Sequence, residues 1–373
     1  MVKIMQILVT GAKGFVGKNL VLELKNQGYT DVFEFDIDTD PLLLDKFCTE
    51  TDFVFHLAGV NRPKDQSEFM EGNFGFTSTL LDTLKSHKNT CPVMISSSTQ
   101  AALENPYGQS KKAGEELMFS YARETGARVF VFRFPNVFGK WCRPNYNSAV
   151  ATFCNNIASD LPIQINDRSA VMNLVYIDDV VEELLHAVKG TPNQAGEYCS
   201  VAVTYTITLG EIVDLIYSFK ASREERGIPD MTDAFTSKLY STYLSYLPRD
   251  QFNYPLKMNV DNRGSFTEFI RTPERGQISV NVSKPGITKG NHWHHSKNEK
   301  FLVVSGRGVI RFRQIGTDEI IEYHVSGDKL EVVDIPTGYT HNIENVGDTE
   351  MVTVMWANEC FNPEKPDTYF LEV

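Results

Sequence analysis

The stretch Ile4-Met-Gln-Ile-Leu-Val-Thr10-Gly11-Ala-Lys-Gly14-Phe-Val-Gly17 decides how the first half of the chain folds. Residues 4–10 are apolar and β-rich, as in a central strand of a parallel sheet. Three glycines spaced three apart follow, and the apolar periodicity of residues 18–26 predicts a helix. Glycines between a strand and a helix let a pyrophosphate approach the backbone and sit on the helix N-terminus. The stretch therefore predicts a parallel α/β sheet with a dinucleotide site; the alternative is a tight turn without a ligand.

The next two predicted strands carry further candidates for cofactor binding. Residues 32–35 end in Asp36, and an acid at this place commonly binds the adenosine ribose hydroxyls. Its charge repels a 2′-phosphate, so Asp36 favours NAD over NADP; the alternative is a helix or loop cap. Residues 52–57 close in Ala58-Gly59, where small side chains let a cofactor pass close to the strand end. The predicted cofactor-binding residues are Gly11, Gly14, Phe15, Val16, Gly17, Asp36, Leu57, Ala58, Gly59 and Lys111.

A run of hydroxyl side chains follows the apolar residues 92–95, which predict another buried strand. Hydroxyls at a strand end lie where open parallel sheets place ligands. Tyr107 and Lys111 come soon after and are four residues apart, so on a helix they share one face. The ammonium would lower the pKa of the tyrosine, which could then exchange a proton with a substrate alcohol or carbonyl. The alternative is a surface tyrosine beside a solvated lysine.

The composition of the whole chain indicates a globular protein of two domains. The 373 residues are 42% hydrophobic and 23% charged, and the formal net charge is −12. No block of Lys or Arg stands out, which argues against binding to nucleic acid or to an anionic membrane. Six scattered cysteines without a CxxC pair are typical of reduced thiols. Because no signal peptide or long apolar run is visible, we expect a cytoplasmic protein.

The sequence pattern changes near Pro248. Residues 248–255 are rich in turn residues, and the alternation of strands and helices stops beyond them. Seven short β-rich runs follow, which is typical of an all-β barrel or sandwich. The runs are 266–270, 276–283, 300–304, 308–313, 320–325, 329–335 and 351–356. We therefore predict two domains, 1–247 and 248–373.

Histidines in the β-rich half form a candidate metal site. His292 and His294 are two residues apart, so on a strand they share a face. Glu299 and the distant His341 complete a set of three imidazoles and one carboxylate, which suits Zn²⁺, Fe²⁺, Mn²⁺ or Ni²⁺. His295 is an alternative to His294, although strand alternation and the spacing to Glu299 favour His294. The simpler interpretation is that these histidines serve solubility or hydrogen bonding.

The first half resembles an extended short-chain dehydrogenase/reductase over roughly residues 4–240. The motifs that carry the resemblance are Gly11/Gly14/Gly17, His56-Leu-Ala-Gly59, Asn73, Ser96-Ser-Ser98, Tyr107-x-x-x-Lys111, Arg133-Phe-Pro-Asn136-Val-Phe-Gly139 and Tyr176-Ile-Asp178. The resemblance implies a Rossmann-type doubly wound sheet with Tyr107 as acid/base and Lys111 as its tuner. It implies Ser98 as the hydroxyl partner, with Ser97 as the alternative. It also implies a sugar-nucleotide substrate, whose diphosphate would be bound near Asn136, Lys140, Arg143 and Arg168.

His56 and Asn73 can each be interpreted without the family resemblance, and the spacing between Ser98 and Tyr107 departs from it. A lone histidine in a strand is usually hydrogen-bonded in the core, which is what we expect for His56. Asn73 precedes a predicted helix at 74–85 and could be no more than its N-cap. Only eight residues separate Ser98 from Tyr107, a short insert for this family. The short insert would leave the site more open over the sugar.

The second half resembles a cupin. The motifs are Gly286-x5-His292-x-His294-x4-Glu299-x6-Gly306 and Pro336-x-Gly338-x2-His341-x3-Asn345. Residues 261–268 are also similar to the entry strand of cupins that epimerise deoxysugar nucleotides. A reductase followed by a cupin, over the full length, resembles the bifunctional enzymes of capsular polysaccharide synthesis. That resemblance implies NADPH, Zn²⁺ and a homodimer; because NADPH conflicts with Asp36, the choice between NADPH and NADH stays open.

The resemblance implies two reactions on a UDP-linked 4-keto-6-deoxy-N-acetylhexosamine. The cupin half would invert C3. The reductase half would then deliver hydride to C4, giving UDP-N-acetyl-6-deoxy-L-talosamine, toward N-acetyl-L-fucosamine of surface polysaccharide. The metal could be an electrophile or purely structural. The alternatives are a reductase with a structural, metal-stabilised dimerising cupin, and a sugar-nucleotide sensor without turnover.

Overall fold

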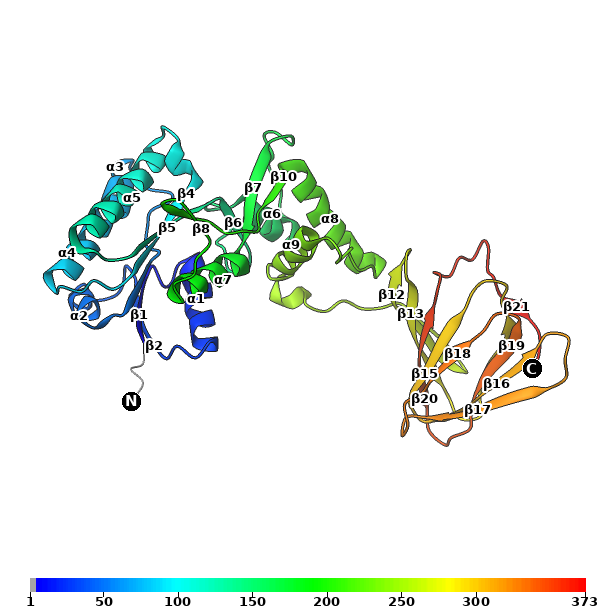
Figure 1. Ribbon diagram of the computed structural model, residues 1–373. Helices are drawn as coiled ribbons and strands as arrows, with labels where there is room; N and C mark the ends of the chain where they lie inside the picture. The colour runs from blue at the N-terminus through cyan, green and yellow to red at the C-terminus, as the bar shows by residue number, and fades with distance from the viewer. Residues whose placement is uncertain (1–4) are drawn as a thin grey trace. The chain divides into compact units, whose positions relative to one another are not determined.

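The computed structural model describes residues 5–373, which form two compact units (Figure 1). The first unit contains the chain up to Tyr217 together with residues 232–248, and the second contains residues 218–231 and 249–373. The boundary near 248 lies one residue from the predicted one. The segment 218–231 falls in the second unit, whereas the predicted division leaves it in the first.

Hydrogen bonds explain why residues 218–231 group with the second unit. The backbone carbonyl of Arg226 accepts the N–H of Arg271 on strand β12 (Gly264–Thr272) at 2.9 Å. The Arg226 guanidinium also contacts the Glu268 carboxylate on the same strand at 2.9 Å. The segment therefore lies along the edge of a sheet in the second unit and includes the end of helix α8 (Leu209–Glu225).

A seven-stranded sheet forms the centre of the first unit, in the order β2-β1-β3-β4-β5-β9-β8. All neighbouring strands are parallel except β8 and β9. The strands are β1 Gln6–Thr10, β2 Asp31–Phe35, β3 Phe53–His56, β4 Val93–Ser98, β5 Val129–Phe134, β8 Gln194–Ala195 and β9 Tyr198–Cys199. The predicted first strand starts at Ile4, which lies outside the described residues.

Helices cover both faces of this sheet, which confirms the predicted doubly wound α/β class (Figure 1). One face is covered by α2, α4 and α5, and α1 packs against α7 on the other. The helices are α1 Phe15–Asn26, α2 Leu42–Glu50, α3 Ser67–Phe69, α4 Phe76–Ser86, α5 Pro106–Thr125, α6 Ala149–Ala158, α7 Ile177–Val188 and α9 Ala234–Leu244. A smaller sheet joins β6 Asn136–Phe138, β7 Val171–Tyr176 and β10 Tyr205–Thr208 in the order β10-β7-β6.

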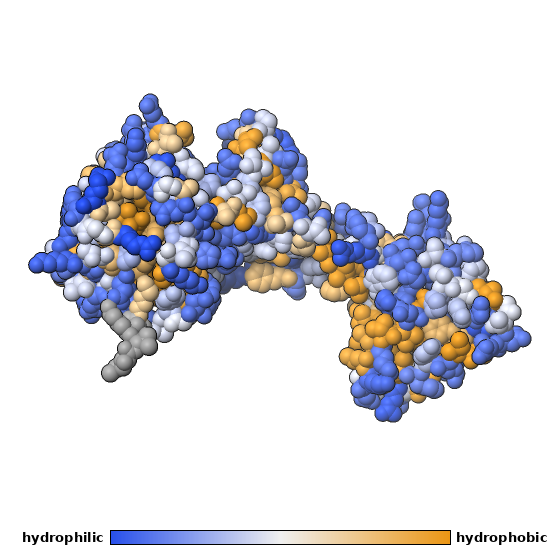
Figure 2. Space-filling view, viewed as in Figure 1, coloured by the Kyte–Doolittle hydropathy of each residue, from blue (hydrophilic) through white to orange (hydrophobic). Residues whose placement is uncertain are grey.

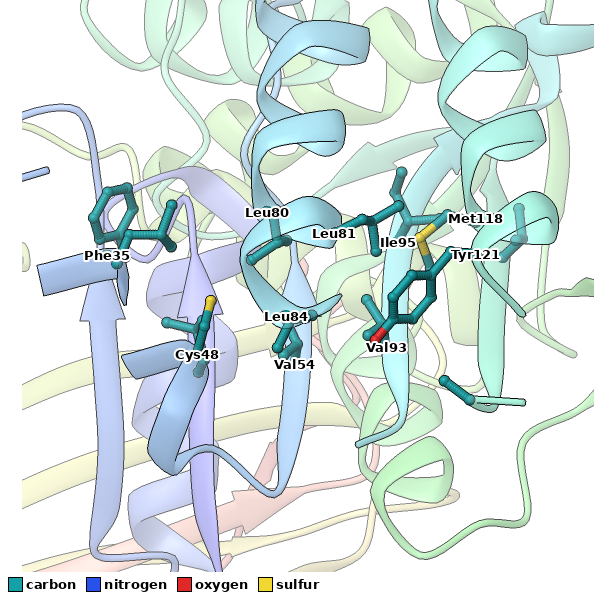
Figure 3. Packing of buried hydrophobic residues seen from close by; sticks show 14 residues of the cluster. Phe35, Cys48, Val54, Leu80, Leu81, Leu84, Val93, Ile95, Met118 and Tyr121 are labelled. Atoms are coloured by element: carbon teal, nitrogen blue, oxygen red, sulfur yellow. The ribbon is translucent and has the colours of Figure 1, made fainter. Parts of the chain in front are cut away.

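The core under α4 and α5 follows from the apolar spacing of both elements (Figure 3). Leu80, Leu81 and Leu84 lie on one face of α4 and are at most 3% exposed. They share a cluster with Val54 and Val93, whose strands are buried on both faces. Burying each leucine contributes about 1.5–3 kcal/mol. This packing fixes α5, and therefore Tyr107 and Lys111, against the ends of the central strands.

The second unit is made of two antiparallel sheets, as expected for a cupin-type β domain. One has the order β11-β12-β13-β20-β15-β18 and the other β17-β16-β19-β14-β21. Their strands, besides β12, are β11 Met258–Asp261, β13 Gly276–Ser283, β14 Thr288–Trp293, β15 Glu299–Ser305, β16 Arg307–Gln314, β17 Ile320–Ser326, β18 Val332–Ile335, β19 Tyr339–Asn345, β20 Met351–Ala357 and β21 Tyr369–Phe370. The predicted β-rich runs fall on seven of these strands but omit β14 and β19, which carry His292 and His341; His294 follows directly after the end of β14.

Apolar side chains also reach the surface of the second unit. Figure 2 shows hydrophobic colour on the face where Figure 1 draws β15 and β20. Val304, Leu330 and Val332 are 39%, 62% and 57% exposed. Among residues 5–373, no helix is long and apolar enough to span a membrane.

Candidate functional site

The glycine loop between β1 and α1 is closely packed against neighbouring backbone. Gly11 has φ +69, and a Cβ there would lie 2.7 Å from the backbone nitrogen of Ala58. A Cβ on Gly17 would lie 2.1 Å from the carbonyl oxygen of Gly11. No side chain caps the N-terminus of α1, which begins at Phe15. Its first N–H groups therefore suit an anionic ligand such as a pyrophosphate.

Asp36 lies at the end of β2 and accepts hydrogen bonds from the loop itself. Its two carboxylate oxygens accept the backbone N–H groups of Lys13 at 2.7 Å and Ile37 at 2.8 Å. The loop-cap role that the sequence offers as an alternative is thus present in the structure. Lys13 pairs with Asp38, so a cation from the glycine loop lies beside this acidic end of β2. Lys13 precedes Asp36 by 23 residues, so the sequence around Asp36 gives no sign of this cation.

The hydroxyl cluster at the end of β4 meets Tyr107 and Lys111 in the first turns of α5. The Ser98 side chain lies close enough to the Tyr107 hydroxyl to lower the pKa of that phenol. The Lys111 ammonium lies 5.9 Å from the centre of the tyrosine ring and donates to the carbonyl of Ser96 at 3.1 Å. Ser97 instead donates to the Glu115 carboxylate at 2.5 Å. The structure therefore brings Ser98, Tyr107 and Lys111 together, and it directs Ser97 elsewhere.

The local sequence explains where this site begins. Asn105 caps α5 by accepting the N–H of Gly108 at 2.8 Å, and Pro106 occupies the first helical turn. Both are favoured at a helix start. Tyr107 therefore lies in the first turn, next to the ends of the strands. Glu115, two turns later, is 1% exposed and pairs with the Arg133 guanidinium on β5 at 2.6 Å.

Burial shifts the pKa values of both proton-carrying groups. It lowers the pKa of Lys111 to about 8, although Glu115 opposes this change. It raises the pKa of Tyr107, and Ser98 only partly opposes that increase. The expectation that Lys111 lowers the pKa of Tyr107 is therefore wrong for this structure, because burial of the phenol outweighs its neighbours. A buried ammonium therefore lies near a buried phenol, and both groups can hold and release a proton.

Asn73 and Gly59 shape the floor of this site. Asn73 lies in a π-helical turn (η1, Met70–Gly75), and α4 begins only at Phe76, so the N-cap interpretation of Asn73 is wrong. Its side chain exchanges two 3.0 Å hydrogen bonds with the backbone of Val60 and donates to Ser110. A Cβ on Gly59 would lie 2.7 Å from the Asn73 amide oxygen and 3.1 Å from the Lys111 ammonium.

His56 is fully buried, as expected, and both ring nitrogens are satisfied. They lie 2.8 Å from the hydroxyls of Thr10 and Thr77. Burial lowers the pKa of His56 to about 3, and the nearby Lys111 adds to this effect. His56 is therefore a neutral core residue at neutral pH.

The four predicted diphosphate-binding residues each have a local partner. Asn136 donates to the carbonyl of Asn173 at 3.3 Å, and Arg143 lies 5.2 Å from the ring centre of Tyr146. Arg168 pairs with Asp214, and Lys140 pairs with Asp178. Lys140 also lines a groove between α1 and α7. Within residues 5–373, no two of the four contact each other, and a common binding point for them stays a prediction.

A cluster of possible metal ligands lies inside the second unit. Its residues are His292, His294, Glu299 and His341, and one ligand atom from each lies within 4.8 Å of the others. His292 and His341 face each other across the β14–β19 pair. Glu299 begins β15. The His295 ring instead packs against Trp293 and Tyr369, outside the cluster.

Asp367, which the sequence analysis missed, holds this cluster from the C-terminal segment. Its backbone carbonyl accepts a hydrogen bond from Nδ1 of His294. Its carboxylate accepts the backbone N–H groups of His295, Ser296 and Lys297 at 2.7–2.9 Å. With Nδ1 directed at this carbonyl, Nε2 of His294 is the ring nitrogen that faces the cluster, and it lies 3.4 Å from Glu299. This arrangement is typical of the groups that orient metal ligands.

The donor chemistry of the cluster fits a divalent transition metal. Both ring nitrogens of His341 are buried; among the described residues Nδ1 has no hydrogen-bond partner, and Nε2 faces the Glu299 carboxylate at 3.3 Å. Burial opposes ionisation of Glu299, yet His294, His341 and Lys297 hold its pKa well below the usual range. Burial also lowers the pKa of His292 to about 4, with His341 contributing. An ionised carboxylate beside an imidazole whose pKa is lowered, that of His292, suits the binding of a metal.

The cluster opens into a cavity of about 520 Å³ between the two sheets. This volume lies in the range of small-molecule sites. Gln277, Ser279 and Asn281 on β13 give one wall polar groups. The other lining residues include Phe266, Lys289, Lys297, Phe301 and Trp356. The cavity therefore offers both apolar surface and hydrogen-bonding groups to a ligand at the metal cluster.

Both units of the chain match known protein families. Residues 7–201 match the model described as "NAD dependent epimerase/dehydratase family", and residues 259–369 match "Polysaccharide biosynthesis C-terminal domain". The UDP-2-acetamido-2,6-beta-L-arabino-hexul-4-ose reductase of Pseudomonas aeruginosa is 45% identical over 99% of both chains. The crystal structure of the capsular polysaccharide assembling protein CapF from Staphylococcus aureus is 58% identical, with a TM-score of 0.94, and the match covers 99% of this chain and 100% of that one.

A more distant structure shares the fold of the first unit only. UDP-glucuronic acid 4-epimerase from Bacillus cereus, in complex with NAD, is 24% identical with a TM-score of 0.52. The match covers 58% of this chain and 85% of that one. The two full-length relatives, in contrast, match over both units of this chain.

Proposed function

This chain belongs to the NAD dependent epimerase/dehydratase family, and from that premise we propose that it is a bifunctional UDP-sugar enzyme. At the coarser level, it is a nicotinamide-dependent enzyme of the UDP-sugar reductase and epimerase class. The proposal adds two steps on a UDP-linked 4-keto-6-deoxy-N-acetylhexosamine: inversion of C3 in the second unit, then reduction of C4 in the first. One observation carries it, namely that a single chain holds two separate clusters of reactive side chains.

In the first unit, we assign Tyr107 as the acid that protonates O4 of the sugar during reduction. The nicotinamide, when bound at the glycine loop, supplies the hydride. The raised pKa of Tyr107 supports this role, because the phenol holds its proton at neutral pH until O4 becomes an alkoxide. Ser98 orients the carbonyl through a second hydrogen bond, and Lys111 stabilises the phenolate once the proton has left.

The choice between NADPH and NADH depends on the acidic end of β2. The negative charge of Asp36 disfavours a 2′-phosphate, as the sequence already indicates. Its two backbone hydrogen bonds and the nearby Lys13 ammonium weaken that argument. We therefore propose NADPH or NADH without preference and expect the two to be distinguished by kinetics.

In the second unit, we propose that the cavity at the metal cluster catalyses inversion of C3. The C3 proton is acidic because the 4-ketone accepts the electron pair as an enolate, so the site must supply a base and an electrophile. The Pseudomonas relative is a hexul-4-ose reductase by name, which supports a 4-keto sugar nucleotide as the substrate. The product after both steps would be UDP-N-acetyl-6-deoxy-L-talosamine, a precursor of N-acetyl-L-fucosamine in surface polysaccharide.

We propose Zn²⁺, or another divalent transition metal, as the ion of this cluster. The buried ring of His341, whose Nε2 faces Glu299, and the ionised Glu299 support it. The ion would polarise the carbonyl oxygen of a bound sugar. The residues that would hold it are His292, His294, Glu299 and His341.

The test of the proposal is proton exchange at C3 in D₂O, with the full chain and no nicotinamide. We expect loss of the C3–H signal in the NMR spectrum of the UDP-4-keto sugar. The Tyr107→Phe variant should exchange this proton as fast as the wild type while losing reduction. If nicotinamide were oxidised and the C3 proton never exchanged, the protein would be a reductase with a structural cupin.

We also propose a homodimer. The exposed apolar side chains Val304, Leu330 and Val332 on the second unit support an interface through its β-sheet. Sedimentation should give twice the mass of the chain. Replacing Val332 with Lys should shift the equilibrium toward the monomer.

A further inference from the structure

A β-bulge in β14 changes which side chains face the cavity. Across the β14–β19 pair, Lys289 is opposite Ile343, Gly290 is opposite Asn342, and His292 is opposite His341. Two residues of β14 thus advance against one of β19, with Asn291 as the extra residue. Residues three apart on a regular strand face opposite sides, but the bulge turns Lys289 and His292 to the same side.

The bulge is fixed by its own residues. Gly290 has φ +107, and a Cβ there would lie 2.8 Å from the carbonyl oxygen of His341. Asn291 has φ 58, and its side-chain oxygen accepts a hydrogen bond from Asn342 at 2.8 Å. Its backbone carbonyl accepts the N–H of Leu371 at 3.0 Å. The left-handed backbone is therefore held on both sides, as expected for a bulge that re-aims a side chain.

Lys289 lies in the same cavity as His292 and is held by neutral groups. Its ammonium donates to the side-chain oxygen of Asn281 at 2.8 Å and to the carbonyl of Val282 at 2.9 Å. An ammonium has three N–H groups, so one is left for a ligand. Asn281 is 3% exposed and lines the cavity as well.

The other charged groups of the cavity are already neutralised. Lys297 lies 3.4 Å from Glu299, and Glu268 pairs with Arg226 at 2.9 Å. For Lys289, the described residues place no carboxylate within 4 Å. Burial lowers the pKa of Lys289, and the more distant Asp261 and Arg263 act on it in opposite directions. An anionic oxygen in the cavity would favour the charged form of Lys289 and so oppose the effect of burial.

We propose that Lys289 is a catalytic residue that donates a hydrogen bond to O4 of the sugar during C3 inversion; this rests on the proposed epimerase function. When a base of the cavity takes the C3 proton, the C3–H electron pair forms a C3–C4 double bond, and the carbonyl pair moves onto O4. Lys289 stabilises this enolate oxygen. Return of a proton to the opposite face of C3 restores the ketone, so no oxidant or reductant is consumed.

The placement of Lys289 fits this role. Across the bulge, Lys289 and His292 are separated by one two-residue step of the partner strand, about 7 Å. That distance allows O4 of a single sugar to lie within reach of both the metal cluster and Lys289. A preorganised donor in a buried site, aimed where charge develops, is worth a factor of about 10²–10³ in rate.

The experiment compares Lys289→Met, Lys289→Gln and Lys289→Arg in the full chain, with metal content and melting temperature measured for each. The substrate is the UDP-4-keto sugar in D₂O, and the readouts are kcat and KM for C3 exchange. We expect kcat to fall about 10²–10³-fold in the Met and Gln variants, with KM changed less than threefold. The Arg variant should recover part of the rate because it keeps the charge. Lys300→Met, at an exposed pair with Asp334, is the matched control and should exchange at the wild-type rate.

Two results would overturn the assignment. A higher KM with unchanged kcat would show that Lys289 binds the diphosphate, or another anionic group of the substrate, equally in the ground state and the transition state. Wild-type exchange in a folded, metal-loaded Lys289→Gln protein would show that it has no role. If the wild type did not exchange the C3 proton, the proposed epimerase function would be wrong. If the wild type exchanged it and the Lys289 variants did so equally fast, only the role of Lys289 would be wrong.

Discussion

The two candidate sites differ in how much of each is local in sequence. In the first unit, Ser98, Tyr107 and Lys111 lie within fourteen consecutive residues, on the end of one strand and the first turns of one helix. In the second unit, His292 and His341 are 49 residues apart and meet only because β14 pairs with β19. A site at the ends of parallel strands is specified by motifs, whereas a site inside a β domain is specified by strand register.

The largest expected effect separates the two sites. Tyr107→Phe should reduce the rate of C4 reduction by about 10²–10⁴-fold, because it removes the proton donor. Exchange of the C3 proton should not change. The matched control is Tyr217→Phe, at a half-exposed tyrosine on α8. Wild-type reduction by Tyr107→Phe would contradict the assignment of this residue.

Removal of the metal should have the complementary effect. His341→Ala, or a chelator with the wild type, should slow C3 exchange more than a hundredfold, since a bound ion stabilises the enolate by several kcal/mol. Reduction of sugar that already carries the inverted C3 should continue. If chelation lowered the melting temperature of the second unit and left exchange intact, the metal would be structural.

Asp367 offers a sharper test of the second site, because it contacts only one of the ligands. Asp367→Asn weakens the hydrogen bonds that hold residues 295–297 and therefore the orientation of His294. We expect metal affinity to fall about 10–100-fold, as measured by equilibrium dialysis with Zn²⁺. Asp348→Asn, at an exposed loop residue, is the control. Unchanged affinity in Asp367→Asn would show that the C-terminal segment does not orient the ligands.

The buried histidine of the first unit predicts a pH effect on stability. The pKa of His56 is about 3 in the folded state and ordinarily about 6.5. Between these values the unfolded state binds a proton that the folded state does not, so the free energy of unfolding falls as pH decreases. At pH 5 this loss is about 2 kcal/mol. Urea unfolding at pH 7 and pH 5 should show a smaller loss in His56→Gln than in the wild type; equal losses would contradict it.

The smallest expected effect concerns cofactor choice. Asp36→Asn removes a negative charge near the ribose but keeps an oxygen that can accept a backbone N–H. The ratio of kcat/KM for NADPH to that for NADH should rise about tenfold, which is 1.4 kcal/mol. Asp38→Asn, which frees Lys13, is the comparison. An unchanged ratio in Asp36→Asn would mean that the charge of Asp36 does not affect binding at the ribose. A wild-type preference of about a hundredfold for NADPH would contradict the sequence interpretation of Asp36.

Much of the fold followed from local pattern. The glycine loop fits its prediction because only glycine tolerates the contacts of Gly11 with Ala58 and of Gly17 with Gly11. The resemblance to a reductase fused with a cupin-type domain is confirmed by the family and structure matches. The sequence predicts residues 218–231 in the first domain, whereas they group with the second unit. Their grouping depends on long-range hydrogen bonds to β12, such as the one between Arg226 and Arg271, which are 45 residues apart.

The parts of the sites that escaped prediction depend on long-range geometry. Ser97 and Ser98 are adjacent on β4, so their side chains point to opposite faces of the sheet. The sequence does not show which of the two faces Tyr107. The role of Asp367 needs a contact across 73 residues to His294. Lys289 was overlooked because its spacing of three from His292 indicates the opposite face of a regular strand. The combination Gly290-Asn291 was the one available signal of a bulge.

The central claim is that one chain first exchanges the proton at C3 and then reduces C4. It is tested most directly by running the complete reaction in D₂O with unlabelled NADPH or NADH and examining the product by NMR. The account predicts deuterium at C3, taken from solvent during inversion, and protium at C4, taken from the cofactor. A product with protium at both carbons would show that C3 is never deprotonated and would contradict the account.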